Sequence, residues 1–200
     1  MPEPCNPEAS TPSPGEIEAL ARRIDRPVVL VGMMGVGKTS VGRRLAAALR
    51  LDFVDADDAI VEAAQMSITE MFERYGEDYF RNGERRVIAR LLDERASDRN
   101  AGGRVIATGG GAFVDSATRA LILERGIAVW LDSDIEILLD RVGRNANRPL
   151  LRHGNPRETL TRLKAEREAL YRAASIHVQS RLGPHQRTVV AILKELEKWR

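Results

Sequence analysis

Residues 32–39 read Gly-Met-Met-Gly-Val-Gly-Lys-Thr, which is the complete pattern of a phosphate-binding loop. The glycines let consecutive backbone N–H groups curve around phosphate oxygens without interference from a Cβ atom. The pattern also needs Lys38 to reach the β- and γ-phosphates and the Thr39 hydroxyl to bind Mg²⁺. An ordinary glycine-rich turn is the alternative. The apolar run at 28–31, typical of a buried strand, and the helical apolar spacing over 41–49 favour the phosphate-binding loop.

The composition indicates an ordinary globular domain. Of the 200 residues, 43% are hydrophobic and 30% are charged, and the net charge of +2 gives no reason to expect a nucleic acid or a membrane as partner. No apolar run is long enough to cross a bilayer, and the chain begins without a signal-peptide pattern. The single cysteine, Cys5, excludes an intramolecular disulfide, and the histidines lack the spacing of zinc ligands. We expect a cytoplasmic protein, and a monomer because no apolar stripe is left over once the core is assigned.

The first part of the chain differs from the rest. Five of the nine prolines fall within the first fourteen residues, among polar residues that cannot bury apolar surface. We therefore expect residues 1–24 to form a disordered tail, with at most a short helix near its end, and residues 25–200 to form one domain.

Strand and helix patterns alternate through that domain. A parallel sheet with helices on both faces is the architecture that such alternation predicts. In these sheets, ligands bind beyond the carboxyl ends of the strands. Strands are predicted at 28–31, 51–55, 104–108, 127–131 and 175–178, and the main helices at 68–76, 77–96, 116–125, 135–144, 157–171 and 186–198, with a polar loop at 145–156.

Two carboxylates stand at the end of the second predicted strand. Side chains at positions i and i+2 of a strand lie on the same side, so Asp55 and Asp57 can both face the site. One carboxylate could hold Mg²⁺ through water, and the other could accept a hydrogen bond from a substrate hydroxyl. The alternative is that these acidic residues only cap the helix that follows.

Two further segments suit a small acidic ligand. Arg81 and Glu84 lie one helical turn apart, so Glu84 can orient the guanidinium of Arg81 toward a carboxylate or a pair of hydroxyls. A surface ion pair is the alternative, and for this pattern alone it is the commoner case. The glycines at 109–111 follow a strand, where they would let the backbone approach a ligand closely; a flexible turn is the alternative.

Arginines gather in and around the loop at 145–156. A lid bearing Arg148 could stabilise charge on a transferring phosphoryl group and exclude water. Solvated surface charge is the ordinary alternative, and we assign it to Arg152 and Arg157.

In this order and at these separations, the segments resemble the shikimate kinase family over about residues 26–195. The resemblance implies a P-loop NTPase fold of the nucleoside-monophosphate-kinase type, a three-layer αβα sandwich with a five-stranded parallel sheet of order 2-3-1-4-5. It also implies ATP-dependent phosphorylation of the 3-hydroxyl of shikimate, a step toward chorismate and the aromatic amino acids. The matching segments are residues 32–39, Asp55-x-Asp57, Phe80-Arg81-x-x-Glu84, Gly109-Gly110-Gly111, Arg148-Pro149-Leu150-Leu151 and Tyr171-Arg172.

The same resemblance implies a role for each matching residue. The implied catalytic residues are Lys38, Asp57 and Arg148. The implied nucleotide contacts are Gly35, Val36, Gly37, Lys38, Thr39, Ser40, Arg141 and Arg148, with Arg141 against the adenine and residues near 181–184 beside it. The implied shikimate ligands are Asp57, Arg81, Gly110, Gly111 and Arg172, with Ile68, Phe72 and Phe80 as an apolar wall. The implied Mg²⁺ ligands are Thr39 and Asp55.

The chemistry of these residues fits the substrate. Shikimate is a small triol with one carboxylate, so its site needs guanidinium groups for the acid and acceptors for the hydroxyls. Arg81 with Arg172 can supply the first, and Asp57 with the glycine backbone can supply the second. Whether Asp57 removes the hydroxyl proton or only orients the hydroxyl stays open.

Two rival functions are possible from the sequence. A gluconate-type carbohydrate kinase would share the fold and the phosphate-binding loop, but the Asp-x-Asp, Phe-Arg-x-x-Glu and triple-glycine segments argue against it. A non-catalytic nucleotide-binding module often lacks the catalytic lysine or a magnesium ligand. Here Lys38, Thr39, Asp55 and Arg148 are all present.

Overall fold

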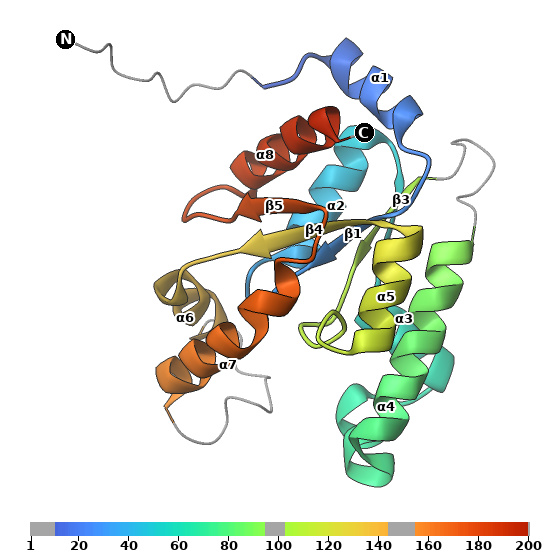
Figure 1. Ribbon diagram of the computed structural model, residues 1–200, viewed down its shortest axis with the longest axis vertical. Coiled ribbons are helices and arrows are strands. Elements are labelled where there is room, and N and C mark those ends of the chain that lie inside the picture. The colour runs from blue at the N-terminus through green and yellow to red at the C-terminus, as the bar shows by residue number, and fades with distance from the viewer. Residues whose placement is uncertain (1–10, 95–102, 144–154, 200) are drawn as a thin grey trace.

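The computed structural model describes residues 11–94, 103–143 and 155–199. Helices and strands alternate through these ranges (Figure 1). The strands are β1 (Val28–Val31), β2 (Asp52–Asp55), β3 (Arg104–Ala107), β4 (Ile127–Asp132) and β5 (Ile176–Gln179). The helices are α1 (Pro14–Arg23), α2 (Lys38–Leu49), α3 (Ala56–Ala64), α4 (Ile68–Asp93), α5 (Ser116–Arg125), α6 (Ile135–Gly143), α7 (Pro156–Tyr171) and α8 (His185–Lys198).

The five strands form one parallel sheet in the order β2-β3-β1-β4-β5. The order confirms the predicted fold class. Strand β1 lies at the centre, where Leu30 is paired with Ala107 of β3 on one side and Val129 of β4 on the other. The loop that follows β1 therefore leaves the middle of the sheet, with the carboxyl ends of β3 and β4 beside it.

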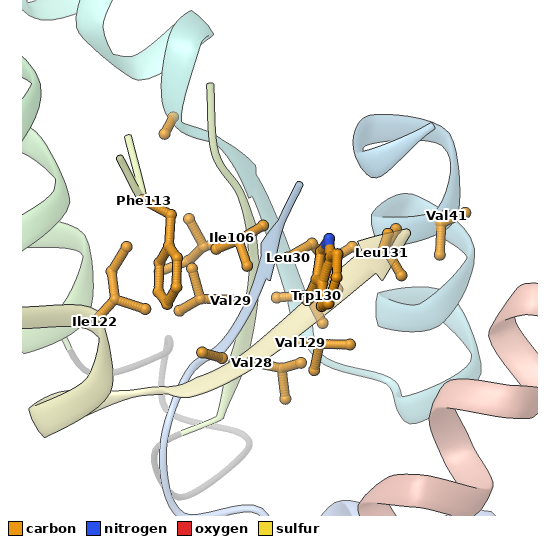
Figure 2. Close-up of a cluster of buried hydrophobic side chains, with 14 of the residues drawn as sticks. Val28, Val29, Leu30, Val41, Ile106, Phe113, Ile122, Val129, Trp130 and Leu131 are labelled. Carbon is orange, nitrogen blue, oxygen red and sulfur yellow. The ribbon is translucent and has the colours of Figure 1, made fainter. Parts of the chain in front are cut away.

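Helices cover both faces of this sheet. In Figure 1, α1, α2 and α8 lie on one side, and α4, α5 and α7 lie on the other. Figure 2 shows Phe113 and Ile122 on one side of the central strands and Val41 of α2 on the other. Because helices pack on both faces of the central strands, all four residues of β1 are buried, as the unbroken apolar run at 28–31 predicts.

The N-terminal boundary of the domain needs correction. Helix α1 begins at Pro14, after a capping box in which the Ser13 hydroxyl accepts from the Glu16 N–H at 3.3 Å and the Glu16 carboxylate accepts from the Ser13 N–H at 2.6 Å. Leu20 and Ile24 are each only 5% exposed and belong to the main core. The stretch from Pro14 to Ile24 is therefore folded: the short helix expected near the end of the tail is present, but it packs on the core and belongs to the domain and not to a disordered tail. Residues 1–10 lie outside the described residues.

Helix α4 is sharply kinked at Gly76, where the backbone has φ 81° and ψ 177°. The kink separates the two helices that the sequence predicts before and after this glycine. Ser67 and Glu70 form the capping box expected at its start. In the described part of the chain, none of the helices combines the length and apolar character required to cross a membrane.

Candidate active site

The phosphate-binding loop connects the central strand β1 to helix α2. Its glycines Gly32, Gly35 and Gly37 have φ values of 135°, 81° and 98°, a region that only glycine enters without strain. Gly37 occupies the N-cap position, so α2 begins at Lys38 and directs its N-terminal N–H groups toward the loop. This is the arrangement in which a helix N-terminus binds a phosphate group.

Lys38 lies across its own loop. Its ammonium group donates hydrogen bonds to the carbonyl oxygens of Gly32 at 2.7 Å and Met33 at 3.0 Å, and the side chain is buried. These contacts hold the ammonium group against the loop whose pattern requires a lysine for nucleotide phosphates.

The two predicted Mg²⁺ ligands are in direct contact. The Thr39 hydroxyl donates to Asp55 Oδ2 at 2.7 Å, although the two residues come from different elements. Oxygen donors of this kind suit Mg²⁺. The described residues contain no group of three or more His, Cys, Asp or Glu side chains placed to hold a metal ion.

Asp57 lies beside the glycine loop, but it is not part of a strand as the sequence pattern predicts. Strand β2 ends at Asp55, which caps α3 by accepting a hydrogen bond from the Asp57 N–H at 3.0 Å. Asp57 therefore lies in the first turn of α3 and not in a strand. It still faces the glycine loop after β3, because a Cβ atom on Gly109 would lie 2.7 Å from Asp57 Oδ1.

Arg81 and Glu84 form a largely buried pair, so the surface ion pair is excluded. Arg81 Nη1 donates to Glu84 Oε2 at 2.7 Å, and the two side chains are 24% and 1% exposed. Glu77 accepts from the other edge of the same guanidinium, at 3.0 Å from Nη2. Two carboxylates thus hold the plane of Arg81 in one orientation.

The pKa of Glu84 reflects the charged side chains around it. Burial raises the pKa of Glu84, the ion pair with Arg81 lowers it, and the nearby carboxylates of Asp57 and Asp115 raise it further; the net direction is upward. The pKa of Arg81 also rises, since its carboxylate partners outweigh burial.

The glycine loop at 109–111 joins the phosphate-binding loop to the corner formed by Asp57, Arg81 and Glu84, which we call the acid-binding corner after the ligand predicted from the sequence. A Cβ on Gly110 would lie 3.2 Å from the backbone nitrogen of Met34, and a Cβ on Gly111 would lie 2.6 Å from Arg81 Nη2. Close backbone approach, and not mere flexibility, therefore explains these glycines. The two predicted binding regions share one rim of the sheet.

Arg172 does not join this corner. Its side chain is 70% exposed and pairs with Glu168 at 2.7 Å. Arg167 lies at the glycine loop instead: its Nη1 donates to the carbonyl oxygen of Gly110 at 3.2 Å, and the Tyr171 hydroxyl donates to the same oxygen at 2.7 Å. Arg167 is not among the site residues predicted from the sequence. The available signal was its spacing of four residues from Tyr171, which puts both on one face of α7.

Phe72 and Phe80, two of the three residues of the predicted apolar wall, lie together beside Arg81. The rings of Phe72 and Phe80 lie 4.7 Å apart between centroids, and the Arg81 guanidinium lies 5.2 Å from the centroid of Phe80. Phe80 is buried, Phe72 is exposed at 36%, and Ile68 packs against the core. An exposed phenylalanine at this position is suited to contact a ligand ring.

Arg141 connects the phosphate-binding loop to the segment before α8. Its guanidinium donates to the Val36 carbonyl at 2.7 Å, to the Ser180 hydroxyl at 3.1 Å and to the Arg181 carbonyl at 3.0 Å. Burial lowers the pKa of Arg141, and the charge of Asp140 opposes the shift. The two segments that the resemblance places near the adenine are therefore adjacent. Residues 145–154 of the predicted lid, Arg148 among them, lie outside the described residues.

Comparison with known proteins gives one family. A family model described as shikimate kinase matches residues 34–197 of the chain. A shikimate kinase from Novosphingobium aromaticivorans is 60% identical over 192 residues, which are 96% of this chain and 98% of that protein. A shikimate kinase from Rhodopseudomonas palustris is 52% identical over 177 residues, 88% of this chain and 84% of that protein.

A solved structure agrees with these sequence matches. The shikimate kinase from Acinetobacter baumannii in complex with shikimate superposes with a TM-score of 0.78 at 35% identity, covering 93% of this chain and 98% of that one. The resemblance inferred from the motifs is thereby confirmed, and both the carbohydrate kinase and the non-catalytic module are set aside. The chain belongs to the shikimate kinase family, and it is an enzyme of the kinase class.

Proposed function

We propose that the site described above carries out ATP-dependent phosphorylation of the 3-hydroxyl of shikimate, which yields shikimate 3-phosphate and ADP on the route to aromatic amino acids. Family membership supports the reaction. The single observation that supports the assignment of residues is the glycine loop at 109–111, which touches the phosphate-binding loop on one side and Arg81 on the other. A donor phosphate and an acceptor hydroxyl bound at these two places would lie next to each other.

The nucleotide half of the site consists of Gly35, Val36, Gly37, Lys38, Thr39 and Ser40, together with Arg141. The loop amides and the N-terminus of α2 would hold the phosphates, and Lys38 would exchange its carbonyl contacts for β- and γ-phosphate oxygens. Arg141 would contact the adenine. Arg148 remains part of the proposal as the residue that stabilises charge on the transferring group.

The proposed cofactor is Mg²⁺. The adjacent oxygens of Thr39 and Asp55 would hold it, directly or through water. When bound, the ion offsets the charge of the β- and γ-phosphates.

The acceptor half of the site consists of Asp57, Arg81, Gly110 and Gly111, and Arg167 replaces Arg172 in it. Arg81 and Arg167 would bind the carboxylate, because both guanidinium groups lie against the glycine loop. Asp57, packed on Gly109, would accept a hydrogen bond from the 3-hydroxyl and orient it toward the γ-phosphate. Since phosphoryl transfer proceeds through a loose transition state, orientation with late acceptance of the proton suffices.

A substrate panel tests the proposed reaction. ADP release is followed by a coupled assay with shikimate, gluconate and other polyhydroxy acids as acceptors. Shikimate should stimulate ADP release, and Asp57→Asn should lower kcat by about 10²-fold or more while ATP affinity stays within about twofold, because Asp57 lies outside the phosphate-binding loop. ATP binding without shikimate-dependent ADP release would refute the function. Near-normal turnover of Asp57→Asn would refute the role of that residue.

A pair of arginine variants tests the exchange of Arg172 for Arg167. Arg167→Ala should raise the KM for shikimate by about 10-fold to 100-fold, the range expected for losing a charged hydrogen bond to a carboxylate. Arg172→Ala should leave both KM values unchanged, since its charge already faces solvent and Glu168. The opposite pattern would return Arg172 to the site.

The location, the oligomeric state and the binding partners of the enzyme are predicted from the sequence. We expect a cytoplasmic monomer that binds ATP and shikimate and neither nucleic acid nor membranes. Size-exclusion chromatography with light scattering tests the oligomeric state, and a stable dimer would contradict the prediction.

A further inference from the structure

Tyr171 is a buried polar residue that no role assigned above uses. It is the last residue of α7, it is 1% exposed, and its hydroxyl donates to the carbonyl oxygen of Gly110 at 2.7 Å. A buried hydroxyl needs such a partner, but the partner here is the middle residue of the loop that contacts both halves of the site. The contact therefore reaches directly into the acid-binding corner.

Two aromatic rings pack against the ring of Tyr171. It stacks on Phe113, with centroids 6.3 Å apart and planes inclined by 12°, and on Trp130, with centroids 5.9 Å apart and planes inclined by 20°. Both neighbours are also buried, Phe113 in the turn that follows the glycine loop and Trp130 in β4. Because a tyrosine ring has few rotatable bonds, this stacking fixes where the hydroxyl lies.

Fixing the Gly110 carbonyl also fixes the next N–H group. The carbonyl of Gly110 and the N–H of Gly111 belong to one planar peptide unit, which is trans because the described chain contains no cis peptide bond. In a trans unit these two groups point in opposite directions. Holding the oxygen toward Tyr171 therefore aims the Gly111 N–H away from α7, and the same glycine lies against the Arg81 guanidinium.

Arg167 shares the same carbonyl oxygen at 3.2 Å. If Arg167 turns to bind the carboxylate of the acceptor, the hydrogen bond from Arg167 to the Gly110 carbonyl weakens. The glycine loop then loses one of its two donors while the substrate is bound. The Tyr171 hydroxyl can remain, because stacking on Phe113 and Trp130 holds its ring in place. Burial raises the pKa of Tyr171 to about 12, against the smaller opposing effect of Arg167, so the hydroxyl is a neutral donor.

We propose that Tyr171 is a positioning residue for the acceptor acid: it anchors the Gly110–Gly111 peptide so that the glycine loop keeps its shape when Arg167 engages the substrate carboxylate. The inference rests on the proposed function of the acceptor half. It predicts that the hydroxyl of Tyr171 affects binding of the acid and not binding of ATP.

Tyr171→Phe tests this with a matched control. The variant removes one oxygen, keeps the ring between Phe113 and Trp130, and leaves Arg167 as a donor to Gly110, so the protein should fold. The KM for shikimate should rise about fivefold to tenfold, the size expected from losing one hydrogen bond, while the KM for ATP stays within about twofold. Tyr79→Phe makes the same chemical change on a ring that is 53% exposed and should alter neither constant.

Each outcome decides a separate point. Equal shikimate KM values for Tyr171→Phe and the wild type, or equal rises in both KM values, would overturn the positioning role. If Tyr171→Phe does not fold, Trp130→Phe replaces it as the test: it keeps the hydroxyl, removes part of the stack, and should raise the shikimate KM alone by about twofold to threefold. An unchanged shikimate KM in that variant would also overturn the inference. A wild-type enzyme without shikimate-dependent ADP release would instead refute the proposed function.

Discussion

A methyl group at position 111 should displace the guanidinium of Arg81 without disturbing the fold. Gly111 is not among the glycines with positive φ, so alanine can adopt its backbone conformation. A Cβ there would lie 2.6 Å from Nη2, 2.8 Å from Nη1 and 3.0 Å from Cζ of Arg81. All three atoms are at the far end of a flexible side chain, so the side chain would move and the loop would stay.

The size of the effect follows from these distances. Non-bonded heavy atoms ordinarily lie ~3.5 Å or more apart, so the guanidinium must shift by roughly 1 Å. A shift of about 1 Å in a group that positions the substrate costs on the order of 10²-fold in rate. We therefore expect Gly111→Ala to lower kcat/KM for shikimate by about 100-fold, or about 2.7 kcal/mol of transition-state stabilisation. The free energy of unfolding should fall by no more than about 2 kcal/mol, because only the far end of the Arg81 side chain has to move.

The assay measures kcat/KM for shikimate at saturating ATP, the KM for ATP, and thermal unfolding. Gly83→Ala is the control, since it makes the same substitution two residues after Arg81 at a position with nothing within 4 Å of the added Cβ. It should leave both kinetic constants unchanged and should raise helix stability by up to about 1 kcal/mol. A folded Gly111→Ala enzyme with kcat/KM for shikimate within about threefold of the wild type would refute the placement of Arg81 at the acceptor acid.

Two further predictions concern stability. Burial and the charges of Arg141 and Arg44 lower the pKa of His185 below its usual 6.5. As the pH falls below 6.5, His185 is therefore protonated more readily in the unfolded chain than in the folded chain, and the free energy of unfolding decreases as the pH falls. His185→Gln should therefore show a smaller fall in Tm than the wild type between pH 7.5 and pH 5.5, which lie about one unit above and below the ordinary pKa of histidine. Parallel curves of Tm against pH for the two proteins would contradict this role of His185. Leu20→Ala should lower the free energy of unfolding by about 2–4 kcal/mol in denaturant titrations, since α1 is part of the core, whereas a loss below about 0.5 kcal/mol would support a tail that extends to Ile24.

The acid-binding corner shows how far sequence patterns reach. The pairing of Arg81 with Glu84 follows from a spacing of three residues on a helix, and the structure has that pair. The spacing does not reveal burial, because burial depends on what packs over α4. Asp57 was expected to face the site as part of a strand, but the strand ended at Asp55 once that side chain capped α3. Local hydrogen bonding overrode the alternation of a strand there.

The choice between Arg167 and Arg172 at the end of α7 also could not be made from the sequence pattern. Arg172 stands next to Tyr171 in the sequence, but neighbouring helical residues point about 100° apart, so only one of them can face the glycine loop. Arg167 shares the face of Tyr171, and the packing of Tyr171 between Phe113 and Trp130 decides that this face turns inward.

The amino-acid sequence by itself determined the alternation of strands and helices, the phosphate-binding loop and the kink at Gly76, because each depends on conformational preferences and hydrogen bonds within a few residues. Tertiary structure decided which charged side chains enter the site and which stay in solvent. That choice depends on how each helix is rotated against the sheet, and the rotation is set by contacts between segments that are distant in the chain. Glu84 and Arg167 acquired their positions in this way, and Arg172 was left outside.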